Sequence, residues 1–260
     1  FLTSLTFLAF SLCASAIYLL NDLLDAPADS RHLTKRFRPI AAGKLDRRLA
    51  LAAVPALLAA GISLAAVVSW QLAGILLAYL AATVLYSLTL KRKMLWDVFT
   101  LAALYTLRII AGAVAIDKDL SFWLLAFSVF VFLSLALVKR FVELSAFSNK
   151  AEMSEAAPSG RGYRLCDIET LHQVGIASCF SAVLVFALYI NSEQVKRLYA
   201  TPEILWLICP ALLYLQLRVW LLARRDEMHE DPVVFALRDL RSQLVLFAIG
   251  LAMLGAKLWA

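Results

Sequence analysis

The sequence predicts an all-α protein, a polytopic bundle of transmembrane helices with eight spans in this chain. Hydrophobic residues make up 62% of the 260 residues and charged residues only 17%, whereas an ordinary soluble domain carries about 25% charged residues. Uncharged runs long enough to cross a bilayer recur along the chain, and no segment alternates apolar and polar residues as a barrel strand does. These observations exclude a soluble globular enzyme, a disordered tail and a disulfide scaffold.

The expected spans follow from the spacing of the charged residues. One spanning helix needs about 20 apolar residues, so the 42-residue uncharged run over residues 49–90 predicts two helices that reverse near Ser69-Trp70-Gln71. Each remaining span is predicted from one apolar run, and these runs cover residues 1–20, 98–116, 120–138, 170–192, 203–223 and 242–259.

The basic residues predict how the chain lies in the membrane. If residue 1 lies near the outer face, 20 of the 25 Lys and Arg residues fall in four inner loops, which are residues 21–48, 91–97, 139–167 and 218–241. Such an excess is typical of cytoplasmic loops. We therefore expect an integral protein of the bacterial inner membrane whose site faces the cytoplasm. The net charge of +6 fits this distribution, so the lipid bilayer is an expected partner and nucleic acid is not.

An acidic motif ends the first expected helix. Asp22, Asp25 and Asp29 are spaced i, i+3 and i+7, with Asn21 beside them, so a helix would place the three carboxylates on one face. Like charges so close together repel unless a cation lies between them, and Mg²⁺ takes carboxylate oxygens together with substrate phosphates. The motif therefore predicts a magnesium site for a diphosphate. A solvated acidic helix end is the alternative, and Pro27 predicts a kink before Asp29.

A basic run follows the acidic motif directly. It contains Lys35, Arg36 and Arg38, preceded by Arg31 and His32. Guanidinium groups bind phosphate oxygens through two parallel hydrogen bonds. Together with the acidic face, these residues predict a polyphosphate site, whereas the run alone would be an ordinary cytoplasmic loop.

The motif N-D-x-x-D-x-x-x-D, followed by Arg38-Pro39 and a turn of small residues, resembles the UbiA superfamily of membrane prenyltransferases. The resemblance implies a UbiA-like bundle of nine transmembrane helices, with Mg²⁺ and diphosphate held by Asp22, Asp25 and Asp29 as catalytic and metal-binding residues. The chain begins at Phe1, inside an apolar run. We therefore expect residues 1–260 to form a single domain that lacks one helix before Phe1.

The second acidic motif, which the aromatic prenyltransferases of that superfamily carry, is partly replaced here by cations. Lys139, Arg140 and Glu143 stand where the second Asp-rich motif is expected, and Tyr163 with Asp167 is a weaker acidic candidate. Lys139 and Arg140 would bind a phosphate without a metal, with Glu143 orienting them from one helical turn away. The alternative is a helix end with a cationic cap.

Three segments resemble one branch of the superfamily, decaprenyl-phosphate phosphoribosyltransferase. They are Thr34–Gly43, Lys139–Leu144 and Ala236–Asp239. The resemblance implies transfer of 5-phosphoribose from phosphoribosyl diphosphate (PRPP) to a polyprenyl phosphate. One Mg²⁺ motif and one metal-free basic cluster suit a donor that carries a diphosphate and a separate 5-phosphate.

Other polar positions are candidate substrate contacts. Arg108 lies within a span, where a charge costs about 2.5–3.5 kcal/mol on insertion scales unless it faces a cavity or a partner. It is interpreted either as a ligand for phosphate or for an aspartate of the acidic motif, or as a structural residue that pairs with Asp97 or extends its side chain to the membrane interface. Tyr86 and Lys91 resemble a superfamily pattern that lines the substrate pocket, although they would serve equally as loop anchors.

Two other functions stay open from the sequence. One is a prenyltransferase that joins a prenyl diphosphate to an aromatic or other acceptor, for which two acidic motifs are expected. The other is a transporter, which requires charged residues along a path at the bilayer midplane. Arg108 alone meets that requirement, so the transporter is the distant alternative.

Overall fold

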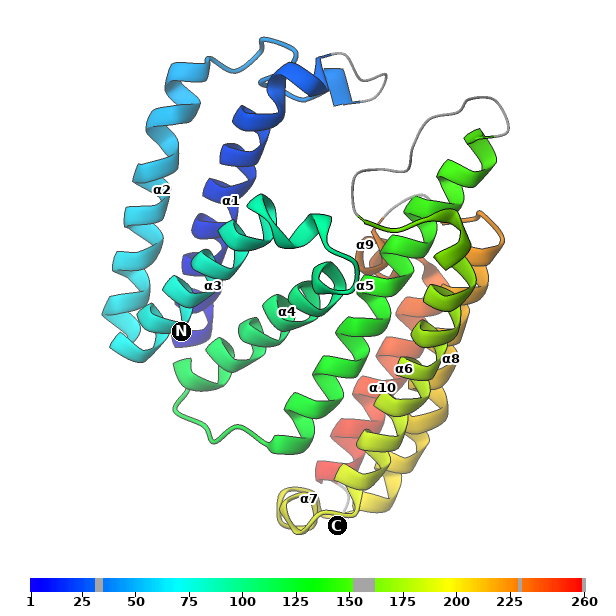
Figure 1. The fold of residues 1–260 in the computed structure, drawn as a ribbon. Coiled ribbons are helices and arrows are strands. Elements are labelled where there is room, and N and C mark those ends of the chain that lie inside the picture. Colours follow the sequence, from blue (N-terminus) through cyan, green and yellow to red (C-terminus); the bar gives the residue numbers. More distant parts are fainter. Residues whose placement is uncertain (31–34, 152–161, 229–230, 259–260) are drawn as a thin grey trace. The chain divides into compact units, whose positions relative to one another are not determined.

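The computed structural model describes residues 1–30, 35–151, 162–228 and 231–258. Throughout these residues the regular structure is helical (Figure 1). The α-helices are α1 (Leu2–Asp29), α2 (Arg47–Val68), α3 (Trp70–Leu88), α4 (Trp96–Ala115), α5 (Phe122–Ala151), α6 (Ile168–Ile190), α7 (Glu193–Leu198), α8 (Ile208–Arg224), α9 (Pro232–Arg238) and α10 (Leu240–Leu258). The 3₁₀ helices are η1 (Lys35–Phe37), η2 (Leu90–Arg92), η3 (Leu165–Asp167) and η4 (Pro202–Leu207).

Eight of the described helical segments are long and apolar enough to cross a bilayer. They confirm the predicted all-α polytopic bundle. The reversal expected near Ser69 is also present, since Ser69 ends α2 and its Oγ accepts a hydrogen bond of 3.0 Å from the backbone N–H of Leu72 in α3. The kink predicted at Pro27 does not end the first helix, because α1 continues through Pro27 to Asp29.

The chain divides into two compact units. Unit 1 comprises Phe1–Leu90 and Leu107–Asp119, and unit 2 comprises Lys91–Thr106 and Leu120–Ala260. The single domain expected over residues 1–260 stays a prediction.

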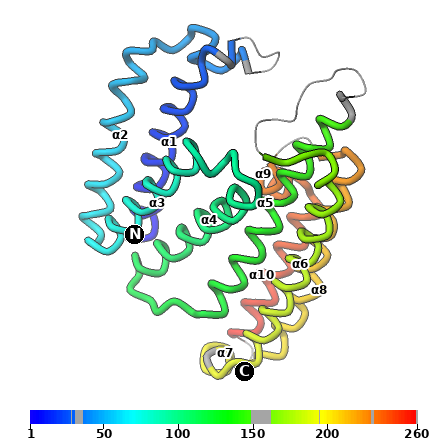
Figure 2. The backbone as a smooth tube through the Cα atoms, in the orientation of Figure 1, coloured from blue at the N-terminus to red at the C-terminus, as the bar shows by residue number. Residues whose placement is uncertain are grey.

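In unit 1, α1 and α2 pack side by side and are joined at one end by the segment that carries the basic run (Figures 1 and 2). A small apolar cluster closes this end. Ala26 of α1, Ile40 of the connecting segment and Ala50 of α2 are buried together. This cluster fixes the end of the acidic helix against the segment that follows it.

Unit 2 has the larger core, in which α5, α6 and α8 pack together. Trp220 of α8 is 1% exposed, and its indole N–H donates a hydrogen bond of 3.0 Å to Ser134 of α5. Gly175 of α6 lies against the same indole ring, because a Cβ atom at this position would come within 1.9 Å of Trp220 Cζ2. Small residues allow such close approach of helices in membrane bundles.

Replacing Gly175 by alanine is therefore expected to lower the free energy of unfolding by about 1–3 kcal/mol, because the added methyl group overpacks the core around Trp220. The matched control is Gly250→Ala in α10, where a Cβ atom meets nothing within 4 Å. Alanine at that position should be neutral or stabilising by up to about 1 kcal/mol. Denaturant unfolding in detergent micelles measures both variants, and equal effects would contradict the assigned contact.

Candidate functional site

The acidic motif occupies the last two turns of α1 in unit 1. Asp22 is partly buried, Asp25 is exposed, and the side chain of Asp29 is only 6% exposed. Asn21 is partly buried at the start of the motif. Helix C-termini disfavour negative charge, so these carboxylates need a positive group nearby.

Arg38 supplies that positive group. One of its guanidinium nitrogens, Nη1, lies 3.0 Å from Asp22 Oδ1 and 2.8 Å from Asp29 Oδ2. Backbone hydrogen bonds set the position of Arg38, since its carbonyl accepts from the N–H of Ala42 at 2.8 Å and the following turn closes at Gly43. Gly43 has a φ of +70°, which glycine adopts without steric cost. The turn thus directs Arg38 back to the acidic face of α1.

The acidic end of α1 suits a hard divalent cation. Asp22 and Asp29 direct carboxylate oxygens to one positive atom, and Mg²⁺ prefers oxygen ligands of this kind. Within the described residues, no three His, Cys, Asp or Glu side chains are already arranged around one metal position. The residues that would hold Mg²⁺ are Asp22 and Asp29, with the exposed Asp25 on the same helix.

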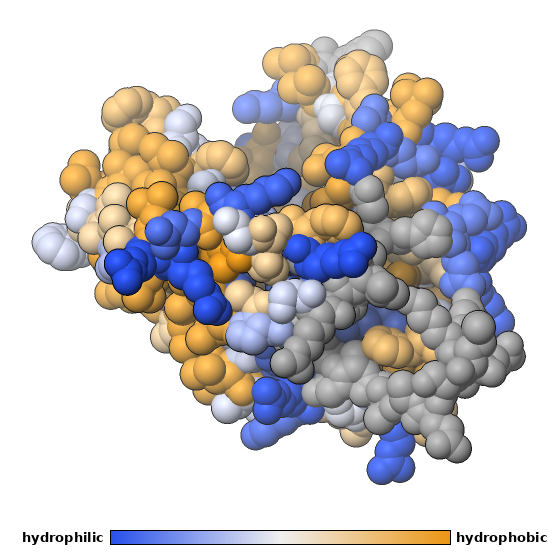
Figure 3. Space-filling model, turned by 90° about the horizontal axis from the view of Figure 1, so that it is seen from above, coloured by the Kyte–Doolittle hydropathy of each residue, from blue (hydrophilic) through white to orange (hydrophobic). Residues whose placement is uncertain are grey.

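The rest of the basic run is only partly described. Arg36 is exposed, and its guanidinium lies over the ring of Phe37 at 4.9 Å from the centroid. Arg31 and His32 lie outside the described residues, and so does the side chain of Lys35. Figure 3 looks onto this end of unit 1, where hydrophilic side chains lie beside hydrophobic ones.

The two cations predicted to bind phosphate in unit 2 have different environments. Lys139 is exposed, and its Nζ donates to Asp231 Oδ2 at 3.0 Å, ahead of α9. Arg140 is only 3% exposed and forms an ion pair of 2.6 Å between Nε and Asp97 Oδ2. Its Nη1 also pairs with Glu143, three residues later in the same helix. Lys139 is therefore accessible to an anion, whereas Arg140 is buried between carboxylates.

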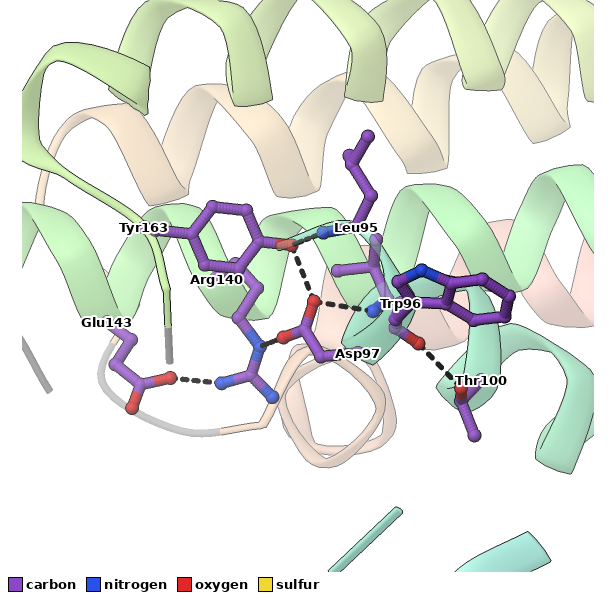
Figure 4. A network of polar contacts seen from close by, with 8 residues as sticks. Leu95, Trp96, Asp97, Thr100, Arg140, Glu143 and Tyr163 are labelled. Atoms are coloured by element: carbon purple, nitrogen blue, oxygen red, sulfur yellow. Dashed lines mark hydrogen bonds and ion pairs between the residues drawn. The ribbon is translucent and has the colours of Figure 1, made fainter. Parts of the chain in front are cut away.

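Figure 4 shows how Asp97 organises this buried network. Asp97 lies in the first turn of α4 and is fully buried. The hydroxyl of Tyr163 donates to Asp97 Oδ1 at 2.5 Å and accepts from the N–H of Leu95 at 3.0 Å. Burial, followed by the hydrogen bond to Asp97, raises the pKa of Tyr163 above its usual range. Tyr163 thus attaches the segment before α6 to the beginning of α4.

Tyr163 and Asp167, the weaker acidic candidate of the sequence, have different structural roles. Tyr163 belongs to the Asp97 network, while Asp167 accepts a hydrogen bond of 2.8 Å from the backbone N–H of Arg164 at η3. Asp97 and Asp231 were not predicted as the partners of Arg140 and Lys139, and Tyr163 was not predicted as a partner of Asp97. The sequence signal for Asp97 was its position at the start of a span, four residues after the last of three consecutive cations.

Arg108, the cation predicted to lie within a span, lines a cavity in unit 1. Arg108 donates a hydrogen bond of 2.7 Å to Tyr79 Oη and also lies over that ring. The cavity has a volume of about 390 Å³ and is lined by α1 and by Arg108 and Gly112 of α4. Asp97 pairs instead with Arg140. Tyr86 in the last turn of α3 and Lys91 in η2 are both partly buried, and their expected substrate contacts stay predictions.

Asp239, part of one segment that carried the resemblance, has a structural partner. Its carboxylate accepts hydrogen bonds from Arg218 at 2.9 and 3.2 Å, and from the N–H and hydroxyl of Ser242 at 2.9 and 2.8 Å. The Arg218 hydrogen bonds, assisted by Ser242, lower the pKa of Asp239 from 3.8 to about 2. The residue therefore joins α8 to the beginning of α10.

Replacing Asp239 by asparagine is expected to lower the free energy of unfolding at pH 7 by about 2 kcal/mol. Because the folded-state pKa is depressed, this stabilisation is present above the unfolded value of 3.8 and is lost as the pH falls toward 2. The difference between the variant and the unmodified chain should therefore shrink between pH 5 and pH 2. A difference that stays constant over this range would contradict the assigned pair.

Comparison with known proteins identifies relatives of this chain. The model of the UbiA prenyltransferase family matches residues 1–155. Nodulation protein NoeC of Azorhizobium caulinodans is 32% identical over 251 residues, which cover 96% of this chain and 80% of NoeC. Protein y4nM of Sinorhizobium fredii is 43% identical over 248 residues, which cover 94% of this chain and 47% of y4nM.

A third relative is the decaprenyl-phosphate phosphoribosyltransferase of Mycobacterium tuberculosis, 35% identical over 178 residues. That match covers 68% of this chain and 59% of the mycobacterial protein. The chain thus spans about half the length of y4nM and 59% of the mycobacterial relative.

A solved structure supports the fold independently. The UbiA homolog from Archaeoglobus fulgidus bound to GPP and Mg²⁺ superposes with a TM-score of 0.66 at 17% sequence identity, over 96% of this chain and 83% of that one. Helix content, spans, family match and fold agree, and the chain is an integral membrane protein. It belongs to the UbiA prenyltransferase family.

Proposed function

We propose that the protein is a Mg²⁺-dependent transferase that moves 5-phosphoribose from PRPP to a polyprenyl phosphate at the cytoplasmic face of the inner membrane. The observation that carries the proposal is the convergence of Asp22 and Asp29 on one positive charge at the end of α1. Family membership and the likeness to a decaprenyl-phosphate phosphoribosyltransferase support it. The excess of basic residues in the predicted inner loops supports the cytoplasmic orientation.

The reaction joins the lipid phosphate to the sugar. An oxygen of the polyprenyl phosphate forms a bond to the anomeric carbon of PRPP, while the bond from that carbon to the diphosphate breaks and the diphosphate departs with the electron pair. Bound Mg²⁺ would stabilise the negative charge that develops on the leaving group. The attacking oxygen is already anionic, so the reaction requires no strong general base.

Each group of residues then has a chemical role. Asp22, Asp25 and Asp29 hold the cation, and Arg36 and Arg38 neutralise donor phosphates from the adjoining segment. Lys35 is assigned the same role from the sequence. In unit 2, Lys139 is the exposed cation assigned to a phosphate group, and Arg140 has a positioning role because it is buried between Asp97 and Glu143.

The environment of Lys139 and Arg140 favours PRPP over a prenyl diphosphate. A second metal motif would need carboxylates that are available to a cation. The described carboxylates beside these residues are Asp97, Glu143 and Asp231, and each is paired with Arg140 or Lys139. Unit 2 therefore offers an ammonium group for direct contact with an anion, in place of a second metal motif.

A comparison of two substrate pairs tests the proposal. Purified protein in lipid nanodiscs receives labelled PRPP with polyprenyl phosphate, or prenyl diphosphate with an aromatic acid, each with and without Mg²⁺. We expect a labelled, lipid-extractable product from the first pair only, and only with Mg²⁺. Product from the second pair alone would overturn the proposal and establish the prenyltransferase alternative.

A further inference from the structure

Arg38 occupies the position in unit 1 that the proposed metal requires. A single nitrogen of its guanidinium contacts both Asp22 and Asp29, at 3.0 and 2.8 Å. Two carboxylates that approach one atom would repel each other without a positive charge between them. Arg38 therefore serves as an internal counter-ion for the acidic motif.

The burial of the three side chains is unequal. The Asp29 side chain is 6% exposed, the Asp22 side chain is 31% exposed, and the Arg38 side chain is 39% exposed. The 2.8 Å contact with Arg38 places a positive charge beside this buried carboxylate and offsets the cost of removing it from water. The guanidinium, by contrast, is accessible and carries five N–H donors, so it can exchange these carboxylates for phosphate oxygens with little change in burial.

We propose that Arg38 and Mg²⁺ compete for Asp22 and Asp29, and that the guanidinium released by the metal becomes a contact for the donor diphosphate. Metal and diphosphate then bind cooperatively, because the metal frees the group that the diphosphate needs and the diphosphate holds that group away from the carboxylates. This inference rests on the proposed function, since it assigns Mg²⁺ and a diphosphate to the same acidic end of α1.

The local fold keeps Arg38 within reach of the site in both states. The turn after Arg38 is closed by hydrogen bonds from the N–H groups of Lys44 and Leu45 to the carbonyl of Pro39, at 2.9 and 3.1 Å. Ile40, two residues after Arg38, is buried against α1 and α2. With the backbone fixed, the exchange needs only a rotation of the long arginine side chain. Arg36 differs, because its guanidinium lies over Phe37.

The first test measures Mg²⁺ affinity by calorimetry with the full chain in nanodiscs, without any phosphate. Arg38→Gln removes the competing charge and should tighten Mg²⁺ binding by about three- to tenfold. The matched control is Arg48→Gln, which removes one positive charge from an exposed residue of α2 in the same unit. Arg48→Gln should change the Mg²⁺ affinity by less than about twofold. Arg38→Lys keeps the positive charge but loses the planar guanidinium group. Its Mg²⁺ affinity should therefore lie between the affinities of Arg38→Gln and Arg48→Gln.

The second test measures inorganic pyrophosphate affinity at zero and at saturating free Mg²⁺. In the unmodified chain, Mg²⁺ should strengthen pyrophosphate binding. In Arg38→Gln this strengthening should fall by about tenfold, since the charge-assisted hydrogen bonds are lost. Arg48→Gln should keep it. Equal or weaker Mg²⁺ binding in Arg38→Gln than in Arg48→Gln, or an unchanged effect of Mg²⁺ on pyrophosphate binding, would overturn the competition.

A double variant separates this inference from the proposed function. If Asp22→Asn with Asp29→Asn leaves Mg²⁺ binding intact, the metal site itself is misassigned and both proposals fail. If the double variant loses Mg²⁺ binding while Arg38→Gln does not tighten it, the competition alone is overturned. Thermal unfolding of each variant confirms that the compared proteins are folded.

Discussion

Replacing Asp97 by alanine is expected to lower the free energy of unfolding by about 3–5 kcal/mol, which is the usual effect of removing one partner from a buried ion pair. Asp97 is fully buried and Arg140 is 3% exposed, so the change leaves a positive charge in the core without the carboxylate beside its Nε atom. Tyr163 loses its hydrogen-bond acceptor at the same time. Denaturant unfolding in detergent micelles measures this loss.

The control for this prediction is Glu143→Gln, which removes the other carboxylate beside Arg140. The Glu143 side chain is 29% exposed, so water compensates much of the lost interaction and we expect a cost of about 1 kcal/mol or less. Tyr163→Phe, which removes one buried hydroxyl, should cost about 1–3 kcal/mol. Equal effects of Asp97→Ala and Glu143→Gln would show that burial of the Asp97–Arg140 pair does not determine its contribution.

The membrane helices could be predicted from the sequence because they depend on local composition. Each span is an apolar run of about the length that the hydrocarbon thickness requires, and the reversal at Ser69 follows from the length of one run that is twice as long. The acidic face of α1 was predictable for the same reason, since the spacing of Asp22, Asp25 and Asp29 is a local property of a helix.

The distant partners of Lys139 and Asp97 could not be predicted, because residues far apart in the sequence meet only in the folded chain. Lys139 pairs with Asp231, 92 residues later, and Tyr163 meets Asp97 across 66 residues. Lys139 and Arg140 are adjacent cations at the end of an apolar run, so nothing in their local pattern predicts different environments for them. Helix geometry places neighbouring residues about 100° apart, and one of the two is therefore buried while the other is exposed.

The same reasoning applies to Arg38. The sequence predicted a phosphate ligand, since Arg38 belongs to a basic run that follows the acidic motif. Its pairing with Asp22 and Asp29 depends on the turn that Gly43 closes and on the burial of Ile40. The sequence pattern assigns Arg38 one role, whereas the folded segment gives it two carboxylate partners and, in the exchange proposed above, a phosphate partner from the same position.

Replacing Asp22 by asparagine is expected to reduce kcat/KM for PRPP by about 100-fold, the largest catalytic effect among single changes in the acidic motif. Asparagine keeps the shape of the side chain but removes the charge that would hold Mg²⁺ on the leaving diphosphate. Asp25→Asn should reduce kcat/KM by only about tenfold, because the exposed Asp25 lies apart from the Arg38 guanidinium on which Asp22 and Asp29 converge. Activity measured against free Mg²⁺ distinguishes weaker metal binding from slower chemistry.

The matched control is Asp119→Asn, which removes one negative charge from an exposed residue of the same unit outside the acidic motif. We expect its kcat/KM to stay within about twofold of the unmodified chain, since exposed charges are screened beyond about 10 Å at 0.1 M salt. A motif whose three aspartates act equivalently would give equal losses for Asp22→Asn and Asp25→Asn. The predicted inequality therefore tests the folded geometry, in which Asp22 and Asp29 converge on one charge, against the spacing alone.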